Sequence, residues 1–191
     1  AWPFRTLDDD EYRNFNDRIQ AYMAKALKEA KIHTSWVNPN HAYDQAVRDF
    51  IEHILARSGP NPFLADFLPF HREIARYGVY NSLSQVLLKI AAPGIPDFYQ
   101  GTELWDFSLV DPDNRRPVDY RMRTGFLADL QLLRATQESE QRQLVQALLA
   151  TVPDGRIKLY LTMVGLHYRR AHVSLFLRGE YVPLEVGGTK K

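Results

Sequence analysis

Residues 93–119 bring carboxylates, arginines and aromatic side chains together in one segment, PGIPDFYQGTELWDFSLVDPDNRRPVD. Within it, Tyr99, Gln100 and Glu103 carry a hydroxyl, an amide and a carboxylate, and each of these groups can hydrogen-bond the hydroxyls of a sugar. The alternative is that Tyr99 packs against the protein and that Glu103 pairs with an arginine of the same loop. The residue types therefore favour either sugar contact or internal bracing, and both hypotheses stay open.

The run DPDNRRPVD at residues 111–119 allows three interpretations. A calcium loop is excluded, because Arg115 and Arg116 occupy its fifth and sixth positions, where such a loop needs an oxygen ligand and a glycine. A catalytic pair of acids fits the spacing, but neighbouring arginines would keep these acids ionised, which does not suit a proton donor. We favour an Asp–Arg network that fixes the loop, with Arg115 or Arg116 donating hydrogen bonds to sugar hydroxyls.

Trp36, Trp105 and His33 are further candidates for substrate contact. An indole face can stack on a sugar ring, because its quadrupole attracts the partly positive C–H edges of the ring; packing in a core or interface is the alternative for both tryptophans. His33 opens the segment HTSW, where a role at the substrate rim competes with a local turn in which Ser or Thr caps a backbone group. The histidines show neither H-E-x-x-H nor H-x-H spacing, so we expect no metal site.

Apolar residues at helical spacing predict that the elements behind these side chains are mainly α-helices. Acidic residues at the start of the first helix and lysines at its end suit the helix macrodipole. Asn38 followed by Pro39 predicts the start of the second helix, and a break is expected near Gly78. The predicted helices cover residues 8–32, 39–58, 71–92, 123–137, 139–150 and 156–172, with a short helix and a turn at 61–70.

Three short segments predict β-strands, at residues 95–99, 173–177 and 180–186. A helix followed by a short buried strand is the repeat unit of an α/β barrel, so residues 95–99 predict one strand of such a barrel. Two strands cannot bury a face alone. The last two segments therefore predict a sheet that continues beyond Lys191.

Composition and charge exclude several classes of function. The chain has 191 residues and a formal net charge of +1 without a basic stripe, so we expect no nucleic-acid partner. It has no cysteine, which excludes disulfides, zinc ribbons and thiol chemistry and fits a cytoplasmic protein. No apolar run reaches the roughly 20 residues that span a bilayer, so no membrane association is expected. The chain opens with Ala1 rather than Met, which indicates processing or an excised piece.

The segment PGIPDFYQGTE at residues 93–103 resembles the eighth strand and following loop of the α-amylase family of glycoside hydrolases, where Pro-Gly-x-Pro-x-x-Tyr-x-Gly-x-Glu is common. Residues 169–184 are similar to that family's passage from the last barrel helix into a C-terminal β-domain. Residues 28–47, 100–120 and 154–162 resemble one branch of the family more closely, the intramolecular transglucosylases that form trehalose ends.

This resemblance implies a fold. The chain would be a mainly α fragment of a (β/α)8 TIM barrel, holding the last strand and helices, and it would run into the start of a C-terminal all-β domain. Residues 1–172 would be the C-terminal part of the barrel with inserted helices, and residues 173–191 the start of the β-domain.

The resemblance also implies a chemistry that needs no organic cofactor. A carboxylate nucleophile forms a glycosyl-enzyme, and a second carboxyl group acts as acid and then as base. The released glucose then attacks through its anomeric hydroxyl, so that the terminal α-1,4 bond of a linear α-1,4-glucan (a maltooligosaccharide) becomes an α,α-1,1 bond, and water must be excluded. The family's catalytic acids follow strands four, five and seven, and no counterpart is found here. We therefore expect no catalytic residue in this chain, and one wall of the substrate site built from Tyr99, Gln100, Glu103, Trp105, Arg115, Arg116, His33 and Trp36.

Two rival functions stay open. The parent protein could be a hydrolase or another transglycosylase of the same family. The chain could also be a non-catalytic helical interaction module, which should be monodisperse without exposed apolar surface. A fragment should instead expose apolar faces that the rest of the parent chain normally covers, and it should dimerise or bind a hydrophobic dye.

Overall fold

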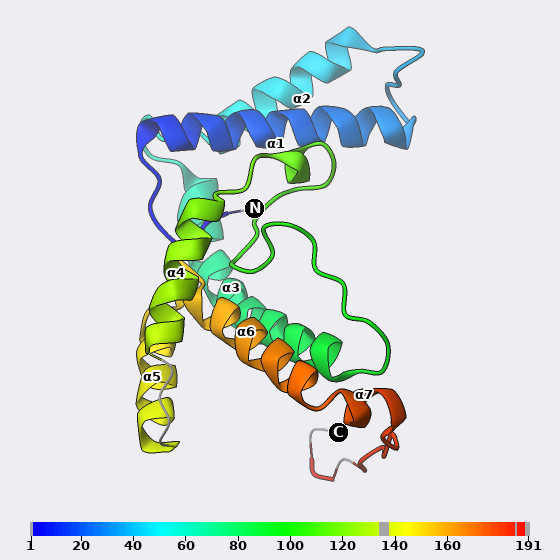
Figure 1. The fold of residues 1–191 in the computed structure, drawn as a ribbon. Helices are drawn as coiled ribbons and strands as arrows, with labels where there is room; N and C mark the ends of the chain where they lie inside the picture. The colour runs from blue at the N-terminus through cyan, green and yellow to red at the C-terminus, as the bar shows by residue number, and fades with distance from the viewer. Residues whose placement is uncertain (1, 134–137, 186, 190–191) are drawn as a thin grey trace. The chain divides into compact units, whose positions relative to one another are not determined.

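The computed structural model describes residues 2–133, 138–185 and 187–189, and within these residues the regular structure is entirely helical (Figure 1). The chain divides into two compact units. Unit 1 comprises residues 1–79 and 106–118, and unit 2 comprises residues 80–105 and 119–191. The elements are α1 (Asp9–Ala30), α2 (His41–Ile54), α3 (Pro62–Ala91), η1 (Asp113–Arg115), α4 (Tyr120–Leu132), α5 (Glu138–Ala150), η2 (Val152–Asp154), α6 (Arg156–Ala171) and α7 (Val173–Arg178).

Unit 1 is built on the pair α1 and α2, which pack against each other (Figure 1). A capping box starts α1, with the Asp8 side chain accepting from the Glu11 N–H and the Glu11 side chain accepting from the Asp8 N–H. The buried Tyr12 hydroxyl donates to the Leu55 carbonyl at 2.7 Å, which ties the start of α1 to the end of α2. The core of this unit consists of Tyr12, Phe15, Ile51, Leu55 and Leu64.

The start of α2 differs from the prediction. Its N-cap is Asn40, whose side chain accepts from the Tyr43 N–H, and not Asn38. Asn38 is used in the preceding turn, where its N–H donates to the Ser35 hydroxyl at 2.9 Å and its carbonyl accepts from the Ser35 N–H at 3.1 Å. The turn that Ser and Thr were expected to stabilise is confirmed, because the buried Thr34 hydroxyl also accepts from the Asn40 N–H at 3.0 Å.

The prediction of two helical pieces between residues 61 and 92 is wrong. The helix α3 runs without a break through Pro69 and Gly78. A glycine in a helix costs only about 1 kcal/mol relative to alanine, and proline removes one hydrogen bond. Buried contacts of Val79, Val86 and Ile90 along the same helix offset these local costs.

Unit 2 is built around α6, which contacts α4, α5 and α7. The second part of α3 also lies along α6 (Figure 1), because Gly165 of α6 leaves room for Ile90: a Cβ at Gly165 would lie 3.0 Å from the Ile90 Cδ1. The core of this unit consists of Leu104, Leu130, Leu148, Ile157, Leu159 and Met163. The predicted helices at 139–150 and 156–172 correspond to α5 and α6; the predicted helix at 123–137 corresponds to α4, and its residues 134–137 lie outside the described residues.

The strand predictions are not met within the described residues. Residues 95–99 are irregular, residues 173–177 form the helix α7, and residues 180–185 are irregular, with residue 186 outside the description. A strand forms only where a neighbouring strand accepts and donates its backbone hydrogen bonds, and the described residues contain none. Residues 173–177 instead complete a local helical turn, in which the Gly179 N–H donates to the Leu175 carbonyl at 2.8 Å.

No helix in the described part of the chain combines the length and the apolar character that a membrane crossing requires.

Candidate functional site

The predicted site residues fall into two sets, one in each unit. His33, Trp36, Arg115 and Arg116 belong to unit 1, and Tyr99, Gln100, Glu103 and Trp105 belong to unit 2. Each unit therefore presents its own part of the candidate site.

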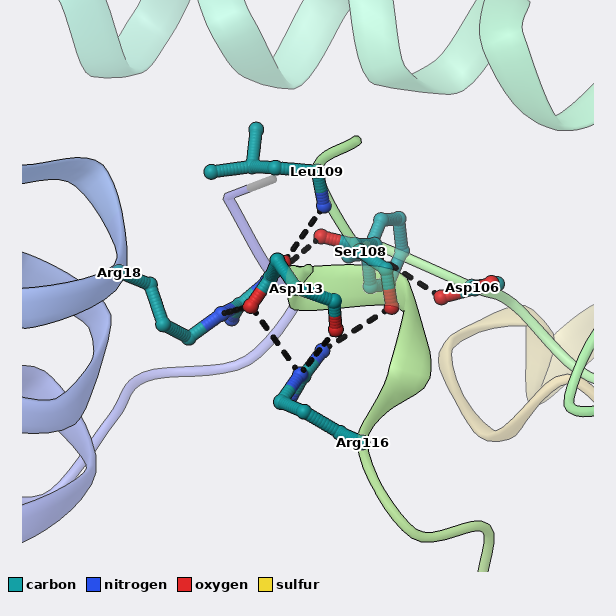
Figure 2. Close-up of polar contacts among 7 residues, drawn as sticks. Arg18, Asp106, Ser108, Leu109, Asp113 and Arg116 are labelled. Carbon is teal, nitrogen blue, oxygen red and sulfur yellow. Dashed lines mark hydrogen bonds and ion pairs between the residues drawn. The ribbon is translucent and has the colours of Figure 1, made fainter. Parts of the chain in front are cut away.

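In unit 1 the loop of residues 106–118 is organised around Asp113 (Figure 2). The Arg18 guanidinium binds this carboxylate through two hydrogen bonds, Nε to Oδ1 at 2.7 Å and Nη2 to Oδ2 at 2.8 Å. The Leu109 N–H donates to Oδ2 at 2.6 Å, and Arg116 Nε forms an ion pair with Oδ1 at 3.2 Å. The Asp113 side chain is only 12% exposed and that of Arg18 only 17%. The Asp113 carboxylate thus has a charged partner and several hydrogen-bond donors, and charge-assisted hydrogen bonds of this kind are stronger than those between neutral groups.

The predicted Asp–Arg network is thus confirmed, and its electrostatic consequence is large. The hydrogen bonds from Arg18, with that from the Leu109 N–H, lower the pKa of the Asp113 carboxyl to about 2. An acid held ionised in this way does not serve as a proton donor near neutral pH. Asp113 therefore braces the loop, as the sequence indicated for most acids of this segment.

Asp113 should make stability fall in acid. Its unfolded-state pKa is about 3.9, so the stabilisation is fully present above about pH 4 and is lost as the pH falls toward the folded-state pKa of about 2. Urea unfolding at pH 7 and near pH 2 should show the wild type losing about 2 kcal/mol more than Asp113→Asn, which cannot titrate at this position. The Arg5 hydrogen bond also lowers the pKa of the exposed Glu11 to about 2. Glu11 titrates in both proteins, so its contribution cancels when their losses of stability are compared. Equal losses in the two proteins would contradict the prediction.

The same loop is held a second time by α1. Lys25 Nζ donates to the Asp111 carbonyl, and the Asp111 carboxylate forms an ion pair with Arg115. The Arg115 side chain is 72% exposed and that of Arg116 49% exposed. Because a guanidinium carries five N–H donors, the exposed side of Arg115 keeps donors directed to solvent.

His33 and Trp36 lie in the connection between α1 and α2. The His33 ring lies 4.9 Å from the Tyr43 ring, and Lys28 Nζ lies 4.7 Å from the centroid of the Trp36 ring. Trp36 is 61% exposed, which is uncommon for so large an aromatic side chain. Trp36 therefore lies outside the core of unit 1, and both stacking on a sugar and packing in an interface stay open for it.

Unit 1 also contains an open groove of about 760 Å³ between α1 and α2. Charged side chains of both signs line it, among them Arg13, Asp17, Lys28, Asp44 and Arg48. None of the predicted site residues lines this groove, so it forms no part of the site that the sequence indicated.

In unit 2, Glu103 pairs with Arg123 of α4. Arg123 Nε donates to Glu103 Oε2 at 3.0 Å, and Arg123 Nη2 donates to the Gly101 carbonyl at 2.8 Å. The alternative in which Glu103 pairs with an arginine is therefore the one observed, although the partner comes from α4 and not from the loop as expected. This pair fixes the turn of residues 99–103 to α4, while Tyr99 and Gln100 on that turn remain exposed.

Trp105 packs inside unit 2. Its indole Nε1–H donates to the Val152 carbonyl at 2.6 Å, and the ring lies against the core of this unit. Lys158 Nζ lies 5.6 Å from the ring centroid and donates to the Leu104 carbonyl at 3.2 Å. The packing alternative is therefore the one observed for Trp105, in contrast to Trp36.

Sequence reasoning missed the basic residues that hold these loops from the helices. Arg18 and Lys25 bind residues 106–118, Arg123 binds the turn at 99–103, and Arg169 of α6 donates to the carbonyls of Ile90, Ala92 and Gly94. On a helix such residues look like ordinary surface charges. Within the described residues, no cluster of His, Cys, Asp or Glu could hold a metal ion.

Known proteins provide an independent comparison. No protein-family model matches the chain. A Mycobacterium tuberculosis protein assigned as a maltooligosyl trehalose synthase is 36% identical over 171 residues, which are 90% of this chain and 19% of that protein. A crystal structure of a maltooligosyl trehalose synthase matches 96% of this chain with a TM-score of 0.80 and 38% identity. By sequence and by fold, this chain is similar to part of the maltooligosyl trehalose synthases.

A second solved structure agrees. The Sulfolobus tokodaii protein described as a hypothetical maltooligosyl trehalose synthase matches 96% of this chain with a TM-score of 0.74 and 35% identity. The chain spans 19% of the length of the curated relative and 22–23% of these solved chains. The resemblance carried by residues 28–47, 100–120 and 154–162 is confirmed by these matches, since the matched proteins are named maltooligosyl trehalose synthases.

Proposed function

We propose that this chain is part of a maltooligosyltrehalose synthase, an isomerase of trehalose biosynthesis that acts on linear α-1,4-glucans. The observation that carries the proposal is the agreement with the maltooligosyl trehalose synthase crystal structure over 96% of the chain, at a TM-score of 0.80 and 38% identity. This agreement extends over nearly the whole chain, so it is stronger support than a match to one short motif would be. The lack of cysteine is compatible with a cytoplasmic location, which we propose with it.

In the proposed reaction the α-1,4 bond at the reducing end of the glucan breaks, the anomeric carbon of the penultimate glucose passes to a carboxylate of the enzyme, and a second carboxyl group gives its proton to the O4 of the departing glucose. The released glucose then attacks that carbon through its own anomeric hydroxyl, whose proton returns to the second carboxylate. This forms the α,α-1,1 bond and frees the first carboxylate. No water is consumed, and the reducing end disappears. We assign the reacting carboxylates to the part of the relatives' sequence that this chain does not span, since both oxygens of Asp113 are engaged by Arg18 and Glu103 is paired with Arg123.

The chain would contribute substrate contacts. Arg115, Arg116, Tyr99 and Trp36 support this role through their exposed donors and ring faces, and exposed Gln100 and His33 lie beside them in the sequence. Glu103 is paired with Arg123, and the Trp105 indole N–H donates to the Val152 carbonyl. We therefore propose that these two residues contact sugar only through atoms that these interactions leave available. Guanidinium and amide donors suit the vicinal hydroxyls of glucose.

The finer fold belongs to the proposal as well. We propose that residues 95–99 become the last strand of a (β/α)8 barrel, and residues 173–191 the start of a β-domain, when the rest of the parent chain lies beside them. Exposed apolar side chains support this, since Ile95 is 97% exposed, Leu177 72% and Leu184 85%. Exposure of this degree leaves these apolar side chains open to contact with further segments of a parent chain. A second copy of the chain would be the substitute partner for the isolated fragment.

The test is a product assay on the full-length protein that carries this chain, with maltopentaose as substrate. Each turnover should remove one reducing end and leave a product that ends in trehalose, because the anomeric carbons of two glucoses become linked. A gain of reducing ends would indicate a hydrolase. An unchanged number of reducing ends with altered chain lengths would indicate another transglycosylase, and unaltered maltopentaose would favour a non-catalytic module. Any of these three results would contradict the proposal.

A further inference from the structure

Side chains on one face of α1 bind the loop of residues 106–118 at several points. Arg18 and Lys25 are seven residues apart, two helical turns, so their side chains lie on the same side of the helix. Arg18 binds the Asp113 carboxylate at 2.7 and 2.8 Å and donates to the Phe107 carbonyl at 3.0 Å. Lys25 donates to the Asp111 carbonyl. The loop is thus attached to a single helix of 22 residues at Phe107, at Asp111 and at Asp113, the first residue of η1.

The attachment bears directly on Arg115. The attachment points Asp111 and Asp113 lead into one 3₁₀ turn, in which the Arg115 N–H donates to the Pro112 carbonyl at 3.0 Å. The Arg115 side chain is oriented by the Asp111 carboxylate. Arg115 follows Asp113 by two residues in this turn, and its guanidinium pairs with Asp111. Fixing Asp111 and Asp113 therefore limits the positions that the Arg115 guanidinium can take.

We propose that Arg18 and Asp113 are positioning residues, which hold the 106–118 loop on α1 so that Arg115 meets the glucan in one orientation and the intermediate reacts with glucose rather than with water. This rests on the proposed function. Neither residue touches the reacting atoms; they act through Arg115. Transfer within the site requires the freed glucose to be held near its attacking geometry, and a displacement of about 1 Å can cost about 100-fold in rate. Water needs no such orientation, so a loosened loop should harm transfer more than hydrolysis.

The experiment replaces Arg18 by methionine in the full-length protein and measures both products from maltopentaose. We expect the trehalose-forming rate to fall roughly 10- to 100-fold and the ratio of hydrolysis to transfer to rise several-fold. A residue that only supported the fold would lower both rates in proportion and leave the ratio unchanged. The matched control is Arg13→Met on the same helix, because Arg13 pairs with Asp10 and its side chain is 74% exposed.

A second variant keeps the test informative if Arg18→Met does not fold. Arg18→Lys retains the charge but loses the two parallel hydrogen bonds. Its ratio of hydrolysis to transfer should be higher than that of the wild type and lower than that of Arg18→Met. If Arg18→Met does not fold, a ratio above that of the wild type is the expected result. Hydrogen exchange should also show faster exchange in residues 106–118 in either variant, since the Leu109 N–H loses a fixed acceptor. An unchanged ratio in a folded Arg18 variant, while the wild type makes trehalose ends, would overturn this inference alone. A wild type without trehalose ends would overturn the proposed function instead.

Discussion

Replacing Leu130 by alanine should lower the free energy of unfolding by about 3 kcal/mol, the typical cost of a buried Leu→Ala cavity. Leu130 of α4 is 1% exposed and belongs to the core cluster of unit 2, together with Leu148 and Ile157. The measurement is urea unfolding of the chain followed by circular dichroism.

The matched control for this change is Leu132→Ala, two residues further along α4. Leu132 is 86% exposed, so its truncation should change the unfolding free energy by less than about 0.5 kcal/mol. Equal effects at the two positions would mean that α4 does not pack through Leu130, and the core assignment for unit 2 would be wrong.

Replacing Gly155 by valine should destabilise the chain by about 3 kcal/mol, through two separate mechanisms. Gly155 has a φ of +78°, a left-handed conformation that a β-branched residue strongly disfavours. A Cβ there would also lie 3.1 Å from both the Leu104 Cβ and the Trp105 backbone nitrogen, and the backbone cannot move aside without shifting the segment that carries Trp105.

The control is Gly59→Val, because Gly59 shares the positive backbone dihedral, with a φ of +98°, but no other atom lies within 4 Å of the place that its Cβ would occupy. This variant should show only the conformational cost of about 1–2 kcal/mol. Thermal and urea unfolding of both variants compare the two costs directly. If the two substitutions destabilise the chain equally, the close approach of Gly155 to residues 104–105 contributes nothing to stability.

The helices of this chain follow from its local sequence. Asp8 and Glu11 form a capping box for α1, and apolar residues at helical spacing place α5 and α6 close to their predicted bounds. These signals work because a helix makes its hydrogen bonds within a few residues. The start of α2 was misplaced by two residues since both Asn38 and Asn40 can cap a helix, and the choice depends on the turn with Ser35.

The strands predicted at 95–99, 173–177 and 180–186 illustrate the opposite case. Their β-branched and aromatic residues favour extended structure, yet a strand needs a partner for its backbone groups. Residues 173–177 have none among the described residues and form α7. Propensity alone therefore could not decide these segments.

Local sequence was enough to predict the helical content, the Asp–Arg character of the 111–119 loop and the similarity to maltooligosyl trehalose synthases, because each of these depends on residues that are close together in the sequence. The contacts that hold the candidate site became visible only in the folded chain. Arg18 meets Asp113 across 95 positions of the chain, and Trp105 meets Val152 across 47. Such pairs leave no periodic trace in a sequence, since folding brings together side chains whose separation along the chain is arbitrary.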